Sequence, residues 1–195
     1  MTRTVEVGPE RLDRWVEGFG ARHDGVTRAD EPGTVVLTGG DGATATGERF
    51  DHERIGLVLV RRGGYAVGRD EGGDVTAHTC GTAYVQSRTK KGGWSQQRYA
   101  RRRGNQADGV LDKVREISLR HLGPGAVDAL VLGGDRRMAE QVLDDPRLAH
   151  LRDLPRRTLW DLPDPRLAVL RDAARRARAV RVVITPERTD GGGVD

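Results

Sequence analysis

Cysteine, aromatic residues and long apolar runs are all scarce in this chain of 195 residues. Cys80 is the only cysteine, so no disulfide can form within the chain, which fits a reducing compartment. Aromatic side chains make up 4% of the sequence, and no apolar run is long enough to cross a bilayer. Residues 1–6 contain no apolar signal-peptide region. We therefore expect a cytoplasmic protein with no membrane partner.

Several common catalytic signatures are also missing. The five histidines are scattered, and no two lie at ligand spacing on one helix. The chain has no Gly-x-Ser-x-Gly nucleophile elbow and no Walker loop. We therefore expect no metal and no other cofactor. Paired carboxylates such as Asp144 and Asp145 are interpreted as caps and surface charge, and Gly133-Gly134 as a tight connection rather than a phosphate cradle.

Apolar periodicity predicts an α/β (α+β) protein with a mixed β-sheet flanked by helices. Strands are expected at 4–7, 34–38, 55–60, 65–68, 75–79 and 82–86, with Gly81 as a possible bulge. A helix that starts at Pro9 would carry Leu12, Trp15, Val16 and Phe19 as one apolar stripe.

In the second half of the chain, the pattern changes to helices alternating with strands. A helix over about 97–122 is expected to stop at Gly123-Pro124-Gly125. Strands at 127–132, 157–162 and 180–185 alternate with helices, which implies parallel pairing. We expect a single domain over residues 1–185, followed by a disordered tail at 186–195.

The densest group of functional side chains lies between Arg88 and Arg103, where seven Lys or Arg residues occur without an acid. Such cations neutralise nucleic-acid phosphates, and Trp94 and Tyr99 offer flat faces for base stacking. The candidate RNA-binding residues are Arg88, Lys90, Lys91, Trp94, Arg98, Tyr99, Arg101, Arg102 and Arg103.

Two glutamines and two glycines lie within this basic stretch. Gly92 and Gly93 allow positive φ and a close approach to another molecule. The amides of Gln96 and Gln97 cannot act as general bases, but an amide can hold a water or stabilise an oxyanion. On residue types alone, a basic hairpin that only binds nucleic acid is an equal interpretation.

These residues resemble a known family. Gly92-Gly93, then Ser95 and Arg98-Tyr99-Ala100-Arg101, are similar to the Gly-Gly-Gln loop and basic helix of eukaryotic and archaeal class 1 peptide release factors. The Gly-Gly-x-x-Gln form, with Gln96 three places after Gly93, resembles the Vms-like branch, specifically its actinobacterial members. The resemblance covers about residues 30–185 and implies an RNase H-like fold like that family's central domain.

The resemblance also implies a reaction, namely hydrolysis of the peptidyl-tRNA ester in the large ribosomal subunit. Gln96 would place or polarise the attacking water, with Gly92 and Gly93 shaping the loop. The cations would engage ribosomal RNA and the tRNA acceptor end. Trp94 stands where the release factors have their glutamine, which makes Gln97 a rival of Gln96.

The chain is too short for the codon-reading and partner-binding domains of release factors. We therefore expect a monomer that rescues stalled or obstructed large subunits without a stop codon. Two alternatives stay open: an endonuclease acting near the tRNA 3′ end, and a non-enzymatic ribosome- or RNA-binding module.

Overall fold

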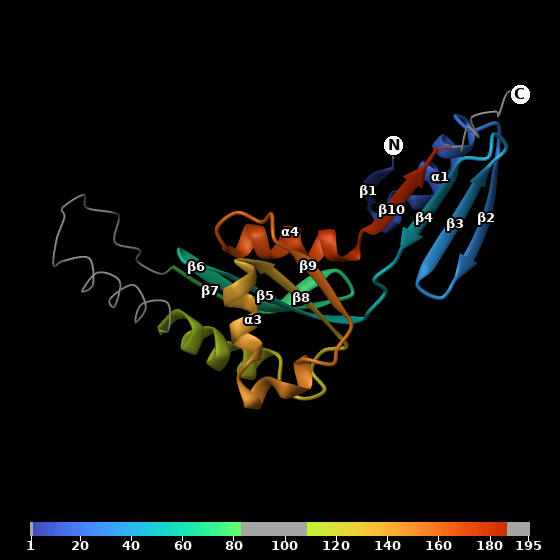
Figure 1. Cartoon of the computed structure of the whole chain (residues 1–195). Coiled ribbons are helices and arrows are strands. Elements are labelled where there is room, and N and C mark those ends of the chain that lie inside the picture. Colours follow the sequence, from blue (N-terminus) through green and yellow to red (C-terminus); the bar gives the residue numbers. More distant parts are fainter. Residues whose placement is uncertain (1, 83–108, 187–195) are drawn as a thin grey trace, which may run out of the picture. The chain divides into compact units, whose positions relative to one another are not determined.

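The computed structural model of the chain describes residues 2–82 and 109–186. The chain forms two compact units, each with one five-stranded sheet (Figure 1). Unit 1 combines the residues up to Asp51 with those from Arg178 onwards, and unit 2 spans His52–Ala177. No helix in the described ranges is long and apolar enough to span a membrane. The predicted α/β class, with helices packed against sheets, is confirmed.

Unit 1 is built around an antiparallel sheet in the order β1-β10-β4-β3-β2. Helix α1 (Leu12–Gly20), preceded by the 3-10 turn η1 (Pro9–Arg11), packs its apolar stripe into the core of this unit. Phe19 is fully buried there, and Leu12 and Val16 are nearly so. The strands are β1 (Arg3–Val7), β2 (Val26–Glu31), β3 (Thr34–Gly39), β4 (Thr44–Glu48) and β10 (Val180–Thr185).

Unit 2 contains a mixed sheet in the order β7-β6-β5-β8-β9. Strands β5, β6 and β7 form an antiparallel meander; β8 then pairs parallel with β5, and β9 pairs parallel with β8. Counted within the unit, this order is 3-2-1-4-5 with the second strand reversed, which is the RNase H-like arrangement that the family resemblance implies. The strands are β5 (Arg54–Arg61), β6 (Gly64–Glu71), β7 (Asp74–Thr82), β8 (Ala129–Gly134) and β9 (Arg156–Leu159).

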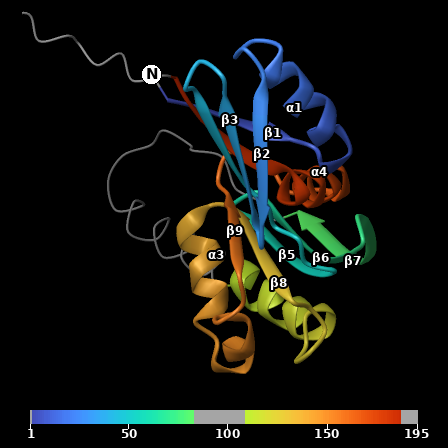
Figure 2. The same ribbon diagram turned by 90° about the vertical axis from the view of Figure 1, so that its right-hand side faces the viewer.

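Helices cover both faces of the unit 2 sheet (Figure 2). Helix α4 (Leu167–Arg178) packs on one face, where a Cβ atom at Gly68 would lie 2.8 Å from Leu170. The helical residues 109–121 and α3 (Arg136–Leu143) share a core cluster with the opposite face. The 3-10 segment η2 (Pro146–Leu151) adds two buried leucines to that cluster. Strand β5, apolar along its length, is buried between these layers, as its continuous apolar run predicts.

Two expectations about the strands were wrong, and two further strands were not predicted. Strand β10 pairs antiparallel with β1 and β4 in the unit 1 sheet, so it does not continue the parallel series. Residues 74–82 form one strand in which Gly81 pairs regularly with Tyr65, and the register shift lies instead beside Arg69 and Asp70. Strands β2 and β4 were not predicted, because all residues of β2 are exposed and β4 has only two buried positions.

Candidate functional site

The basic segment that carries the candidate site lies outside the described residues. This applies to the proposed catalytic residues Gln96, Gly92 and Gly93 and to the rival Gln97. It applies equally to Arg88, Lys90, Lys91, Trp94, Arg98, Tyr99, Arg101, Arg102 and Arg103. The first half of the predicted 97–122 helix also falls there, whereas residues 109–121 are helical as expected. The structure does describe the elements from which this segment departs and to which it returns.

The segment departs from the end of β7, which is held by its full-length pairing to β6. The last pairs are Tyr65 with Gly81 and Gly64 with Thr82. The ring of Tyr65 lies over Gly81, so that a Cβ atom there would be only 2.5 Å from the ring. A larger residue at position 81 would therefore force the Tyr65 ring to move. Strand β7 thus stays registered up to the last described residue before the candidate loop.

The segment returns into the helix at 109–121, which is fixed by the unit 2 core. Val110, Leu111, Val114 and Ile117 are each at most 7% exposed. The helix ends at the predicted Gly123-Pro124-Gly125 stop. A candidate loop carried between a strand paired along its length and a helix packed on the core has a fixed base, which helps a loop to place a reactive group reproducibly.

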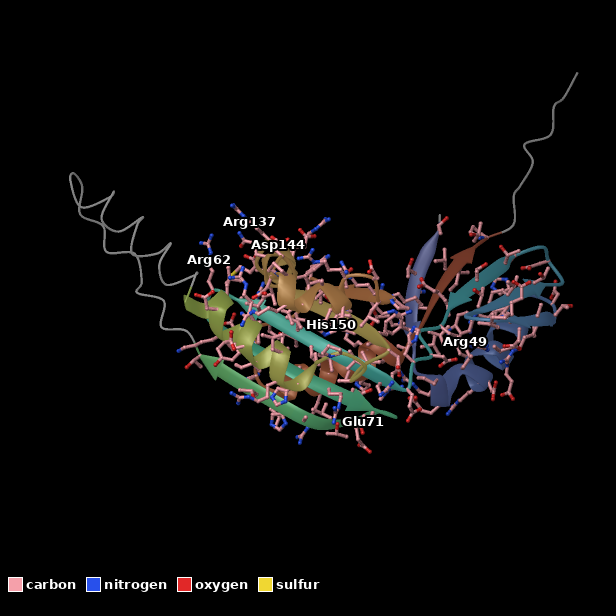
Figure 3. All side chains as sticks on the ribbon, turned by 90° about the horizontal axis from the view of Figure 1, so that it is seen from below. Arg49, Arg62, Glu71, Arg137, Asp144 and His150 are labelled. Atoms are coloured by element: carbon pink, nitrogen blue, oxygen red, sulfur yellow. The ribbon has the colours of Figure 1, made fainter. Side chains whose placement is uncertain are left out.

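Both anchors lie at the same edge of the unit 2 sheet (Figures 1 and 3). Strands β5 and β8 are parallel, and β7 runs in the same direction because both flank the reversed β6. Their carboxyl ends therefore meet at one edge, the edge at which α/β proteins commonly place their sites. The helix at 109–121 starts there, because Leu122 at its other end lies against Gly56 near the start of β5.

The turn between β8 and α3 at this edge is a closed connection. Gly134 has φ +88°, and a Cβ atom on it would lie 2.4 Å from the Val60 carbonyl oxygen. The Asp135 N–H donates to that same oxygen at 2.8 Å, while the Asp135 carboxylate accepts from the Met138 N–H at 3.1 Å. The helix N-terminus is therefore capped by the chain's own carboxylate. This agrees with a tight connection and leaves no basis for a phosphate cradle.

Exposed cations surround this edge. Arg62 and Arg137 extend outward (Figure 3) and have no carboxylate partner in the described ranges. Arg61 lies 3.8 Å from the largely exposed Asp164, a separation too long for a strong pair. Arg136 pairs with Glu140 along α3 at 2.9 Å. The arginines at this edge of the sheet can thus add to the electrostatic attraction between the candidate loop and a polyanion. Arg62 and Arg137 were not singled out from the sequence, since isolated arginines there have no distinguishing pattern.

The titratable side chains on β7 do not form a second reactive centre. Burial raises the pKa of the Cys80 thiol, which keeps it protonated at neutral pH. His121 shares a 2.8 Å hydrogen bond with the Thr79 hydroxyl, and its pKa is lowered mainly by burial and then by Arg120. Within residues 2–82 and 109–186, no group of three or more His, Cys, Asp and Glu side chains could hold a metal ion.

The model of the Actinobacteria/chloroflexi VLRF1 release factor family matches residues 53–183. The chain belongs to this family. The matched range contains all of unit 2, except for His52, together with most of β10. It also includes the whole basic segment and leaves β1 to β4 and α1 outside. As a VLRF1 release factor, the chain has a release-factor-like role in translation and interacts with the ribosome.

The VLRF1 chain is also similar to a solved structure, the archaeal translation termination factor aRF1. The two share 13% sequence identity with a TM-score of 0.40, and the similarity covers 91% of this chain and 67% of that chain. Among curated proteins, none matches the chain.

Proposed function

We propose that this VLRF1 family member is a codon-independent peptidyl-tRNA hydrolase. It releases nascent peptide from stalled or obstructed large ribosomal subunits, as part of ribosome-associated quality control. The observation that carries the proposal is the release-factor family match over the segment containing Gly92-Gly93 and Gln96. The rigid anchoring of that segment on β7 and the helix at 109–121 supports it, because oriented groups need a fixed base.

In the proposed reaction, water adds to the carbonyl carbon of the peptidyl ester. The tetrahedral oxyanion then collapses, the ribose 3′-oxygen leaves, and it takes up a proton. The Gln96 carboxamide orients the water or donates to the oxyanion, and it undergoes no titration in either role. Gly92 and Gly93 let the backbone approach the acceptor end of the tRNA. The basic residues of the segment bind ribosomal RNA phosphates, and the exposed Arg62 and Arg137 add positive charge at the sheet edge from which the segment departs.

A peptide-release assay tests the proposal on large subunits that carry peptidyl-tRNA and no small subunit. We expect the wild-type chain to free the peptide and Gln96→Ala to do so about 100- to 1000-fold more slowly, the usual loss for one oriented donor. Gln97→Ala is the matched control, since it removes the same amide one residue away. If Gln97→Ala is the slow variant, the catalytic amide is at position 97. If both variants match the wild type, the amide mechanism is wrong.

The identity of the product distinguishes the proposed hydrolase from the two alternative functions. An endonuclease acting near the tRNA 3′ end would leave a nucleotide fragment on the released peptide, which mass spectrometry detects. A non-enzymatic binding module would bind the subunits in a salt-sensitive manner and release nothing. A free peptide carboxylate together with an intact tRNA 3′ end is the result expected of the proposed hydrolase.

A further inference from the structure

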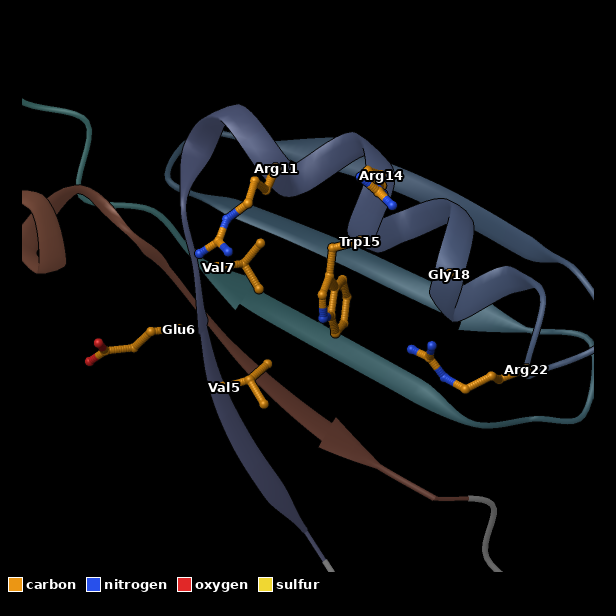
Figure 4. Close-up of a pocket in the computed structure, with 8 residues that line it drawn as sticks. All are labelled: Val5, Glu6, Val7, Arg11, Arg14, Trp15, Gly18 and Arg22. Atoms are coloured by element: carbon orange, nitrogen blue, oxygen red, sulfur yellow. The ribbon is translucent and has the colours of Figure 1, made fainter.

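Unit 1 has a groove beside α1 that plays no part in the proposed reaction (Figure 4). A cavity of about 370 Å³ lies between α1 and β1, lined by Val5, Val7 and Trp15 on its apolar side. An adjoining hollow of about 580 Å³ shares Val5, Trp15 and Arg22 with it and reaches Arg3. All of these residues precede position 53, so they lie outside the range matched by the release-factor family.

The indole of Trp15 is held in place by the Phe19 ring on the core side. It stacks on Phe19 with ring centroids 5.8 Å apart and 25° between the planes. Phe19 is fully buried and its ring also contacts His23, with centroids 4.3 Å apart. Trp15 is itself half-buried, so it keeps an open side toward the groove. A flat apolar surface is therefore presented in a fixed orientation.

The rim of the groove is positively charged. Arg14 and Arg22 are exposed and have no carboxylate partner in the described parts of the chain. Figure 4 shows Arg11 and Arg22 on either side of Trp15; Arg11 extends from η1, and Arg22 from the turn after α1.

Three acids near the rim already have cationic partners, while Glu17 on α1 is exposed and has no ion-pair partner in the described ranges. Asp13 accepts from Arg28 at 2.7 Å, Glu10 lies 3.5 Å from Arg11, and Glu6 lies 3.9 Å from Arg181. The two unpaired arginines are thus left available to an outside anion.

Gly18 lines the groove and, having no side chain, leaves it open. It lies inside α1, where glycine weakens a helix relative to alanine. A Cβ atom at this position would lie 3.4 Å from the Arg22 guanidinium, and apart from its chain neighbours and the backbone of α1 no other described atom comes within 4 Å. A larger side chain at position 18 would therefore extend into the groove without meeting the protein core.

We propose that this groove binds an unpaired nucleotide of RNA. The base stacks on Trp15, and the flanking phosphates pair with Arg14 and Arg22. Stacking on an aromatic face combined with cations along the backbone is how single-stranded nucleic acids are bound without sequence preference. An acidic peptide would satisfy the arginines but would leave the flat indole face without a planar partner. RNA is also the polyanion that a ribosome-interacting protein meets.

The test follows the Trp15 indole N–H signal by NMR in the full-length chain. The three tryptophans, at positions 15, 94 and 160, give separate indole signals, and Trp15→Phe assigns the one from Trp15. A single-stranded oligoadenylate of roughly six nucleotides should shift the Trp15 signal in a saturable manner. A duplex of equal length, whose bases are already stacked, should shift it far less.

Three variants test the parts of the site. Arg14→Glu and Arg22→Glu should each weaken binding about tenfold or more, and each should reduce the salt slope by about 0.7, as expected when one phosphate contact on a single strand is lost. Gly18→Leu should block the shift while every charge is kept. Arg175→Glu is the charge-matched control, because Arg175 lies on α4 beside Asp172 and should leave the Trp15 response unchanged.

Several outcomes would overturn the proposal. One is an RNA that shifts the Trp94 signal and leaves Trp15 unaffected at saturation. Another is a Trp15 shift with oligoglutamate but not with RNA, which would assign the groove to an acidic protein segment. A third is wild-type RNA binding by folded Gly18→Leu together with folded Arg22→Glu. None of these outcomes depends on the Gln96 assay.

Discussion

Two glycines of this protein, Gly134 and Gly18, lie in very different backbone environments. Gly134 adopts a left-handed conformation under the Val60 carbonyl at the edge that carries the candidate loop. Gly18 lies in an ordinary helical position beside an open groove. The same residue type is thus required by the backbone in one place and unfavourable for the helix in the other. Substitution by alanine distinguishes the two situations.

We expect Gly134→Ala to destabilise the protein by about 2 kcal/mol or more, since a non-glycine residue in a strained backbone region costs about 1–3 kcal/mol and the Cβ clash adds to that. Gly18→Ala should instead stabilise it by about 0.5–1 kcal/mol. Urea unfolding of both variants and the wild type measures the two effects. Equal free energies of unfolding for Gly134→Ala and the wild type would contradict the geometry of the β8–α3 turn.

At the scale of elements, helix ends and turns followed local sequence signals closely. The Gly123-Pro124-Gly125 stop ends the helix at 109–121, and Asp135 caps α3. Asp145 was interpreted as a cap, and it accepts from the Arg147 N–H at the start of η2. Such signals act over three or four residues, so they can be read without the fold.

The Asp145 cap also predicts a dependence of stability on pH. The Arg147 guanidinium and then the Arg147 N–H lower the pKa of Asp145 from its ordinary value of 3.8 to about 2. A lowered folded-state pKa stabilises the protein above pH 3.8, and this contribution is lost as the pH falls from 3.8 to about 2. Asp145→Asn should therefore be less stable than the wild type at pH 7, with the difference closing toward pH 2.

Unfolding by urea at pH 7, 5 and 3 measures this difference. Asp144→Asn provides the control, because Asp144 is exposed and has no ion-pair partner in the described ranges. It should change the stability at pH 7 less than Asp145→Asn does. A gap between the wild type and Asp145→Asn that is as wide at pH 3 as at pH 7 would assign the stabilisation to another group.

At the scale of the whole molecule, the last strand of the chain pairs with the first. Unit 1 is completed only by β10, which lies between β1 and β4 in the sheet. One residue, Ala179, separates β10 from α4 of unit 2. The buried Arg157 side chain donates to the Ala177 carbonyl oxygen at 2.7 Å, which holds the end of α4 immediately before that strand.

We therefore predict that residues 1–185 unfold as a single domain. Because only Ala179 separates β10 from α4, we expect that loss of β10 from the unit 1 sheet also disrupts the end of α4. The two units should therefore lose structure together. Thermal unfolding followed by the fluorescence of Trp15 in unit 1 and of Trp160 in unit 2, each in a variant lacking the other two tryptophans, should give coincident transitions. Separate midpoints would show that the units are independent domains. Removal of residues 178–195 should abolish the unit 1 transition, since it splits that sheet.

The sequence by itself determined the buried central strands and the release-factor family, and it places two glycines, two glutamines and seven cations in one segment. Residue types and short spacings carry this information directly, as in Gly92-Gly93 with Gln96 or the apolar run of β5. Only the tertiary structure decided the partners of β10 and the existence of β2, because strand pairing joins residues far apart in the chain and an apolar strand suits either sheet. It likewise decided that the open side of Trp15 faces a cationic groove, since helical spacing shows which residues share a face and not what covers it.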